Sequence, residues 1–474
     1  MRTKIALSCA VLFLTGCSFA PQMKTPKVEL PNIVSHKTVK IDTQWWKGFG
    51  DENLNLLIEE ALKNNDDLRL AVVNVKKARA IYGISEAQMY PQLNLGADAT
   101  RESRSANSYP SSFGGTYNNF SLSASVSYEL DFWGSVRDRE KANFATLLAT
   151  DAQKDALEIA LVSDVASYYF NLVAINEQSQ IAQESLKSYK DTLHYKEMQF
   201  KHGVVDELVV LQAKAQVASA NTQVQTIESS KIKVQNALVL LLGRNPKEIF
   251  QKIVSSSKTL PQGIAIPSGL SASLLQNRPD IKAAEDELSA KTSLIGVAKA
   301  AYFPSVSLSG SYGYQSQTLD KLMQSSSQVW GFGPSVNIPL FDFGRIKQAL
   351  EASKEDQKAA IISYEKVVKI AYKEVFDSLE MIKNSKLKSD ASKEEVDAYQ
   401  AALDMATKKF DRGSVNYLEV LDAQKSLLNA KLTLCDVKSQ LLIADVMLYK
   451  ALGGGWSYEK KREEFLKNNK KDEE

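Results

Sequence analysis

Two carboxylates beside a turn are the residues of this 474-residue chain whose spacing could do chemistry. Glu419 and Asp422 are three positions apart in a helix-forming stretch, so they share one face of a helix. Such a pair can attract cations, or it can simply be part of a solvated helix face. Metal ligation is not expected, because His36, His194 and His202 do not stand at metal-ligand spacings.

The sequence gives no support for catalysis. No glycine-rich phosphate loop follows a strand-like stretch, and no nucleophile elbow is present. Charge is almost balanced, with 58 basic and 56 acidic residues and a net charge of +2, so nothing argues for nucleic-acid binding. The chain is therefore expected to be neither an enzyme nor a nucleic-acid-binding protein, and to need no cofactor.

The N-terminus has the features of an export signal. A basic start precedes a short apolar run, residues 5–14, which is too short to span a bilayer as a helix. Small residues then lead to Cys17, as in a bacterial lipoprotein box, although an ordinary signal peptide is the alternative. Residues 1–16 are thus interpreted as a lipoprotein signal peptide and 17–50 as a lipid-anchored tether. Ser18, in place of aspartate, is typical of lipoproteins sent to the outer membrane.

An internal repeat organises the rest of the chain. The stretch 198–213 recurs at 408–423, and both copies hold a glycine turn between two helix-forming stretches. Further matches in the same order extend the duplication to roughly 190 residues, which predicts two structural repeats at 51–260 and 261–456. The tips of the two helical hairpins are expected at about 202–206 and 412–416.

Two stretches in each repeat alternate apolar residues with small or polar ones, the pattern of strands with two unlike faces. Their lengths suit the about 9–11 residues that a tilted strand needs to cross a bilayer, and aromatic residues lie near their ends. A soluble antiparallel sheet is the alternative, but the export signal and lipid site favour the membrane. The strands are expected at about 91–104, 117–131, 303–316 and 328–341.

Four strands from one chain cannot span a membrane as an open sheet, because the sheet edges would leave unpaired backbone groups in hydrocarbon. Several chains must therefore close the sheet. Bacterial barrels have even strand numbers from about 8 upward, so two chains would give eight strands and three would give twelve. A serine-rich lumen wide enough for solutes favours three chains.

Long helices must carry the hairpin tips. Residues 135–202 and 345–412 contain neither proline nor glycine, and about 67 residues at about 1.5 Å each make roughly 100 Å of helix. These helices would pack side by side into a wall. The segments 245–277 and 453–474 interrupt the helical pattern at matching places, as a belt would, and 457–474 is a charged C-terminal tail.

These features together resemble the TolC-type outer-membrane channels, in particular their lipoprotein branch of the NodT and OprM type. The resemblance is carried by the paired tips, by the aromatic-proline pairs at 90–91 and 303–304, and by the segments LDFWG at 130–134 and LFDFG at 340–344. Residues 278–280, Arg-Pro-Asp, are typical of the branch. The resemblance covers nearly the whole mature chain.

The resemblance implies an α+β membrane protein. It would be a homotrimer with a twelve-stranded barrel in the outer membrane, four strands per chain, continuous with a twelve-helix barrel in the periplasm and a mixed equatorial belt. Its function would be that of a passive exit duct for drugs and small toxic compounds in a tripartite efflux system of a Gram-negative bacterium. The implied partners are outer-membrane lipid, a periplasmic membrane-fusion adaptor and an inner-membrane pump, most often of the resistance-nodulation-division type.

The resemblance also assigns roles to the tips, where grooves would accept hairpins of the adaptor. The docking residues carried over are Gly203, Val204, Val205, Leu208, Gly413, Ser414, Val415 and Leu418. The alternative is that these residues merely close the hairpins. Glu419 and Asp422 would form an acidic ring at the closed periplasmic end, from the second hairpin only, since Val209 and Gln212 stand at the matching positions of the first.

Other functions remain as alternatives at this point. One is an exit duct for type I protein secretion, against which the lipoprotein box and the efflux-type motifs weigh. Another is a lipid-anchored structural coiled-coil protein without a pore, which would have no membrane strands. An enzyme is the weakest alternative.

Overall fold

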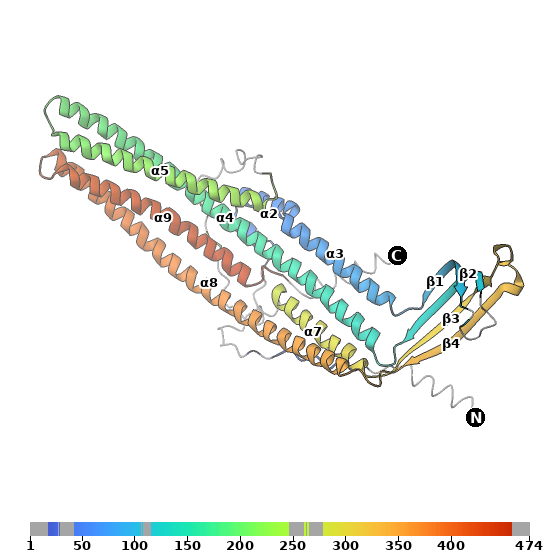
Figure 1. Cartoon of the computed structure of the whole chain (residues 1–474). Coiled ribbons are helices and arrows are strands. Elements are labelled where there is room, and N and C mark those ends of the chain that lie inside the picture. The colour runs from blue at the N-terminus through green and yellow to red at the C-terminus, as the bar shows by residue number, and fades with distance from the viewer. Residues whose placement is uncertain are drawn as a thin grey trace. The chain divides into compact units, whose positions relative to one another are not determined.

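A computed structural model of the chain describes residues 18–26, 28, 42–105, 107, 115–245, 260–261, 263–264 and 278–456 (Figure 1). The expected signal peptide at 1–16, Cys17, the tail at 457–474 and most of the expected belt lie outside these residues. The chain divides into two compact units, and each draws segments from both sequence repeats. Unit 1 comprises Met1–Lys27, Asn74–Asp151 and Ala283–Glu365, and unit 2 comprises Val28–Val73, Ala152–Lys282 and Lys366–Glu474.

The long helices and the returning helices of the described residues come in pairs of equal length. The long helices α4 and α8 have 67 residues each, and the returning helices α5 and α9 have 35 each. Their bounds are Ser135–Lys201 for α4, Glu207–Leu241 for α5, Arg345–Asp411 for α8 and Tyr417–Ala451 for α9. The shorter helices are α2 (Glu52–Asn64), α3 (Asp66–Ala87) and α7 (Pro279–Ala300), with 3-10 turns η1 (Trp45–Phe49), η3 (Leu319–Lys321) and η4 (Ser325–Ser327). Figure 1 shows α5 folding back along α4, and α9 along α8.

Among the described helices, α4 alone is apolar enough over 18 residues to cross a membrane by length and composition. Of that apolar window 61% is buried inside the molecule. A window covered in this way is typical of a helix in a protein core.

Unit 1 contains a four-stranded antiparallel sheet in the order β1-β2-β3-β4. The strands are β1 (Gln92–Arg104), β2 (Gly115–Leu130), β3 (Ser305–Ser316) and β4 (Gln328–Asn337). The expectation of four strands per chain is confirmed. β4 ends at Asn337 rather than near 341, and Pro339, which has no N–H to give to a ladder, lies just beyond this end.

The register of the sheet separates apolar from polar residues. One row of directly paired residues across all four strands consists of Leu95, Ala124, Tyr312 and Trp330. The adjacent row consists of Asn94, Ser125, Ser311 and Gly331. Because side chains alternate between the faces of a strand, these rows lie on opposite faces. The sheet therefore has one apolar face and one face of small polar residues.

The apolar face of the sheet is uncovered in the single chain. Leu95 is 77% exposed and Trp330 78%. β1 and β4 each pair with one strand of the chain, so each has an open edge. A face and two edges of this kind need hydrocarbon on one side and further strands at the edges.

The core of unit 2 is built around aromatic residues of η1 and α4. Tyr169 and Phe170 are fully buried, and Phe49 packs edge-on against Phe170 at 4.8 Å between ring centroids. The Tyr169 hydroxyl donates to Asp51 Oδ2 at 2.6 Å, while Asp51 Oδ1 caps α2 by accepting from two backbone N–H groups. One hydroxyl thus ties the start of α2 to α4.

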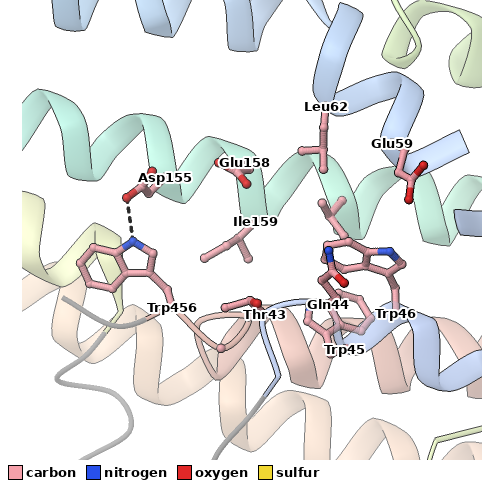
Figure 2. Close-up of a pocket in the computed structure, with 13 residues that line it drawn as sticks. Thr43, Gln44, Trp45, Trp46, Glu59, Leu62, Asp155, Glu158, Ile159 and Trp456 are labelled. Carbon is pink, nitrogen blue, oxygen red and sulfur yellow. Dashed lines mark hydrogen bonds between the residues drawn. The ribbon is translucent and has the colours of Figure 1, made fainter. Parts of the chain in front are cut away.

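Three tryptophans of the same unit lie around one pocket, as Figure 2 shows. Trp45 stacks on Tyr449 of α9 with 5.0 Å between ring centroids, and both Trp45 and Trp46 are buried. Trp456 Nε1 donates to Asp155 Oδ2 at 2.7 Å. These three indoles line a pocket beside α4.

Substitution of neighbours in β1 tests which face meets lipid. Leu95→Arg places a charge on the apolar face and should destabilise a membrane-inserted barrel by about 2–4 kcal/mol. Asn94→Arg, on the opposite face, should leave that stability nearly unchanged and alter single-channel conductance. Urea titration of the protein refolded in lipid vesicles measures the first effect. Equal destabilisation by both variants would contradict the assignment of the faces.

Candidate functional site: the paired hairpin turns

The two hairpin turns have the same backbone geometry. Gly203 and Gly413 adopt left-handed φ angles of 70° and 72°, which favour glycine because it has no Cβ. In the first turn Gly203 N donates to Phe200 O at 2.9 Å and Val204 N to Gln199 O at 2.9 Å. This pair of bonds satisfies the last carbonyls of α4, as in a Schellman motif.

The second turn repeats the pattern at the end of α8. Gly413 N donates to Phe410 O at 2.8 Å, and Ser414 N donates to Lys409 O at 2.9 Å. The N-termini of the returning helices differ, since Asn416 Oδ1 accepts from Glu419 N at 3.3 Å whereas Asp206 makes no side-chain cap. The backbone thus preserves the duplication while the caps do not.

Apolar side chains at the turns are uncovered in the single chain. Val204 is 65% exposed, Leu208 63% and Leu418 48%, while Val205 and Val415 are half-buried. Gly203, Gly413 and Ser414 are exposed as well. All eight residues predicted for docking therefore lie in the turns or in the first helical turn after them. Exposed apolar residues at such a place are costly unless another surface covers them.

An apolar cluster joins the two hairpins next to the turns. Its buried members are Ala213 of α5 together with Tyr417, Val420 and Leu421 of α9. Partly buried residues packed against them come from α4, α5 and α8 and are Leu193, Val209, Leu403, Ala406 and Phe410. The two hairpins are therefore packed against each other next to their turns.

Lys196 is a charged residue inside this junction. It comes from α4, is 4% exposed, and its Nζ lies 4.4 Å from the ring centroid of Phe410 and 5.0 Å from that of Tyr417. Its Nζ also donates to Gln199 Oε1 at 3.1 Å. An ammonium over aromatic faces is attracted by their electron-rich surfaces. A lysine of the first hairpin is therefore held by two rings of the second.

Burial affects the ionisation of this junction. Desolvation lowers the pKa of Lys196, and the negative charge of Asp411 partly opposes that change. Desolvation raises the pKa of Tyr417 to about 12, so the phenol stays neutral. The Lys196 ammonium loses hydration in the folded state, and the negative charge of Asp411 offsets part of that loss.

Sequence reasoning did not find Lys196, although the repeat carries a signal for it. In the second repeat the matching residue is Ala406, and the counterpart of Tyr417 in the first is Glu207. At these positions the two repeats differ in the charge and size of the side chain. Such differences indicate that the two hairpins make different contacts there.

Glu419 and Asp422 lie on the outer side of this junction. Both are exposed in the single chain, on α9, while their neighbours Val420 and Leu421 point into the apolar cluster. The helical period separates the two kinds of side chain in this way. The carboxylates are thus free to meet other chains or solvent.

A two-faced sheet with open edges and a pair of long helical hairpins together define an outer-membrane channel subunit. The chain belongs to the outer membrane efflux protein family, whose family model matches residues 57–244 and 270–454. The expected fold class, the outer-membrane location and the function as an efflux channel are thereby confirmed. The family is one of channel and transport proteins.

Individual relatives cover nearly all of the chain. It is 34% identical to the cation efflux system protein CusC of Escherichia coli O157:H7, over 96% of this chain and 99% of that protein. It is likewise 34% identical to the toluene efflux pump outer membrane protein TtgF of Pseudomonas putida, over 95% and 96%. The crystal structure of the CmeC outer membrane channel of Campylobacter jejuni is similar with a TM-score of 0.87 and 28% identity, over 94% of this chain and 98% of that one.

Removal of Lys196 tests whether it holds the hairpins together. Lys196→Ala deletes an attraction worth about 0.5–2 kcal/mol for a cation over aromatic rings, so the tips should separate more often and mean single-channel conductance should rise. Lys201→Ala is the matched control, because Lys201 is an exposed lysine five residues further along α4. A conductance equal to wild type in both variants would show that Lys196 does not restrain the tips.

Proposed function

We propose that the chain forms a homotrimeric, passive exit duct of a tripartite efflux system for drugs and other small toxic compounds. In this proposal a periplasmic adaptor docks on the hairpin turns, and an inner-membrane pump of the resistance-nodulation-division type supplies the energy. The observations that carry the proposal are the uncovered apolar surface of the two turns and, in the other unit, a two-faced sheet with open edges.

Trimer formation follows from closure of the sheet. Four strands with two open edges need partner strands, and three chains give twelve, an even number that suits a bacterial barrel. The face of Asn94, Ser125 and Ser311 then lines the lumen. The same three-fold arrangement brings three copies of each turn together at the periplasmic opening.

Docking at the turns is supported by exposure and by backbone rigidity. Val204 and Leu208 present apolar surface, and the glycine turn beside them is fixed by its two backbone hydrogen bonds. A partner helix that covers these side chains removes them from water without reordering the turn. Such a surface suits the apolar tip of another helical hairpin.

Val204→Asp tests docking. The charge would have to be desolvated on binding, so affinity for the adaptor of the same efflux system should fall about tenfold or more, measured by surface plasmon resonance. Ile232→Asp is the control, because Ile232 is 55% exposed on α5 but lies away from the turn. Loss of affinity in the control alone, or in neither variant, would contradict docking at the turns.

Glu419 and Asp422 form the periplasmic gate in this proposal. Three copies place six carboxylates in a narrow opening, where they attract cations and repel one another. Their exposure on the side of α9 that faces away from the apolar cluster leaves them available for such a ring. The first hairpin does not contribute acids at matching positions, so the charge of the ring comes from α9.

Conductance of the purified trimer in planar bilayers measures the gate. The wild type should show a small, cation-selective conductance, and Glu419→Ala/Asp422→Ala should raise the conductance and weaken the selectivity. Asp436→Ala removes an exposed carboxylate elsewhere on α9 and should leave both properties unchanged. Pores that are the same in the double variant as in wild type would keep the channel and refute the gate.

The relatives bear on the cargo. The chain is equally similar to a protein named for cation efflux and to one named for toluene efflux. Shared sequence therefore does not follow one cargo chemistry, and a duct lined by small polar residues makes few demands on what passes. Selection of compounds belongs to the pump in this proposal.

Lipid attachment at Cys17 completes the proposal. The lipoprotein box and the serine that follows it support an anchor in the outer membrane. The anchor would then hold the N-terminus at the same membrane that the barrel spans.

A further inference from the structure

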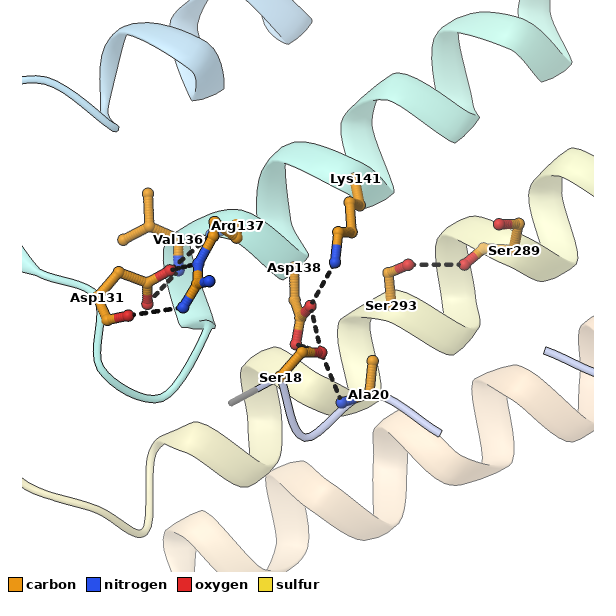
Figure 3. A network of polar contacts seen from close by, with 9 residues as sticks. All are labelled: Ser18, Ala20, Asp131, Val136, Arg137, Asp138, Lys141, Ser289 and Ser293. Carbon is orange, nitrogen blue, oxygen red and sulfur yellow. Dashed lines mark hydrogen bonds and ion pairs between the residues drawn. The ribbon is translucent and has the colours of Figure 1, made fainter. Parts of the chain in front are cut away.

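The first described residues of the chain dock on unit 1 through a hydroxyl, as Figure 3 shows. Ser18 Oγ donates to Asp138, and lies 2.7 Å from Oδ1 and 2.9 Å from Oδ2. Asp138 is fully buried in the first turn of α4, and Lys141 Nζ lies 3.7 Å from the same carboxyl. A buried carboxyl without partners is costly. Ser18 thus supplies a donor to a group that the segment itself helps to bury.

The next residue docks through its ring. Phe19 stacks on Phe303 with 4.7 Å between centroids and an interplanar angle of 12°. Trp133 stacks against both rings, with its centroid 4.8 Å from that of Phe303 and 6.3 Å from that of Phe19. Lys299 Nζ donates to Phe19 O at 3.4 Å. Trp133 follows β2 and Phe303 precedes β3, so Phe19 lies where these strands meet the helices.

A glycine makes room for this segment. A Cβ on Gly296 of α7 would overlap Asp138 Oδ2 and would lie 2.8 Å from Ala20 N. Neither neighbour is the flexible end of a long side chain, so any larger residue must push the segment or the carboxyl away. Gly296 is therefore a structural requirement of the docked arrangement.

The internal repeat shows that these features serve the N-terminal segment and not the repeat fold. The counterparts of Trp133, Asp138, Gly296 and Phe303 in the other copy are Phe343, Gln348, Gly83 and Tyr90. Aromatic residues and the glycine recur, but the carboxyl does not. A Cβ on Gly83 would meet nothing within 4 Å. Only the copy that receives the segment has a buried acid and a glycine in close contact.

We infer that the contact surface formed by Trp133, Asp138, Gly296, Lys299 and Phe303 is a receptor site for the processed, lipid-bearing N-terminus of the chain. It recognises the Ser18 hydroxyl and the Phe19 ring, and it fixes the attachment point of the lipid beside the ends of β2 and β3. Consecutive Cα atoms are about 3.8 Å apart, so whatever group Cys17 carries begins one residue from this receptor site. The lipid and the barrel then enter the membrane at one place.

This inference rests on lipidation of Cys17, which is part of the proposed function. The docking of residues 18–20 and the presence of the lipid are nevertheless separate properties. One peptide that begins at Cys17 reports both, because its mass shows the lipid and its amide exchange shows whether the segment is held.

The experiment uses the full-length protein purified from outer membranes in detergent, with trimer formation checked by size exclusion. Hydrogen–deuterium exchange mass spectrometry follows the N-terminal peptide in wild type, Ser18→Ala, Gly296→Ala and Gly83→Ala. Loss of a hydrogen bond to a carboxyl should raise the exchange rate of the Phe19 and Ala20 amides about tenfold or more in Ser18→Ala and Gly296→Ala. Gly83→Ala, the matched glycine of the other repeat, should keep the wild-type rate.

Each outcome bears on one part of the inference. Wild-type exchange rates in both Ser18→Ala and Gly296→Ala would overturn the receptor site. The same rise in Gly83→Ala as in Gly296→Ala would overturn it too, because the effect would then come from helix packing in general. An N-terminal peptide of unmodified mass, protected or not, would overturn the lipid-holding role together with the proposed anchor.

Discussion

Backbone hydrogen bonding in hydrocarbon is the constraint on which the rest of this protein depends. The sheet β1-β2-β3-β4 leaves one edge of β1 and one edge of β4 without partners in the chain, and water cannot satisfy them inside a bilayer. Closure across copies is the available solution. Once copies must close a barrel, each chain is bound to a symmetric assembly, in which each turn occurs once per copy around the symmetry axis.

The internal duplication provides the strands and the hairpins of one chain in two similar sets. Each repeat supplies two strands and one long hairpin, and the equal helix lengths, 67 and 35 residues in both, keep the two turns in register. Both compact units take segments from both repeats, because strands and helices pack with their counterparts and not only with their sequence neighbours. A repeat defined by sequence is therefore not a folding domain here.

The sequence predicted the elements well, since each depends on local pattern. Period-two alternation located the strands, and the absence of proline and glycine between Gly134 and Gly203 located α4. The turn glycines were evident because their left-handed φ angles restrict the residue type. Contacts between distant segments were not predictable. The contact of Lys196 with the rings of Phe410 and Tyr417 and the hydrogen bond from Ser18 to Asp138 each join residues of different elements. Such contacts produce no periodic pattern in the sequence.

The two repeats differ in residue type at positions where only one of the two copies has a particular contact to make. When the two repeats are aligned, Asp138 corresponds to Gln348, Lys196 to Ala406 and Glu419 to Val209. Two of these three differences lie in the hairpin junction and the third in the receptor site of the N-terminus. A chain has one N-terminus but two copies of the elements that form this site, so only one copy can gain from a buried acid. In the other, an unpartnered carboxyl would be a cost, and an amide is tolerated.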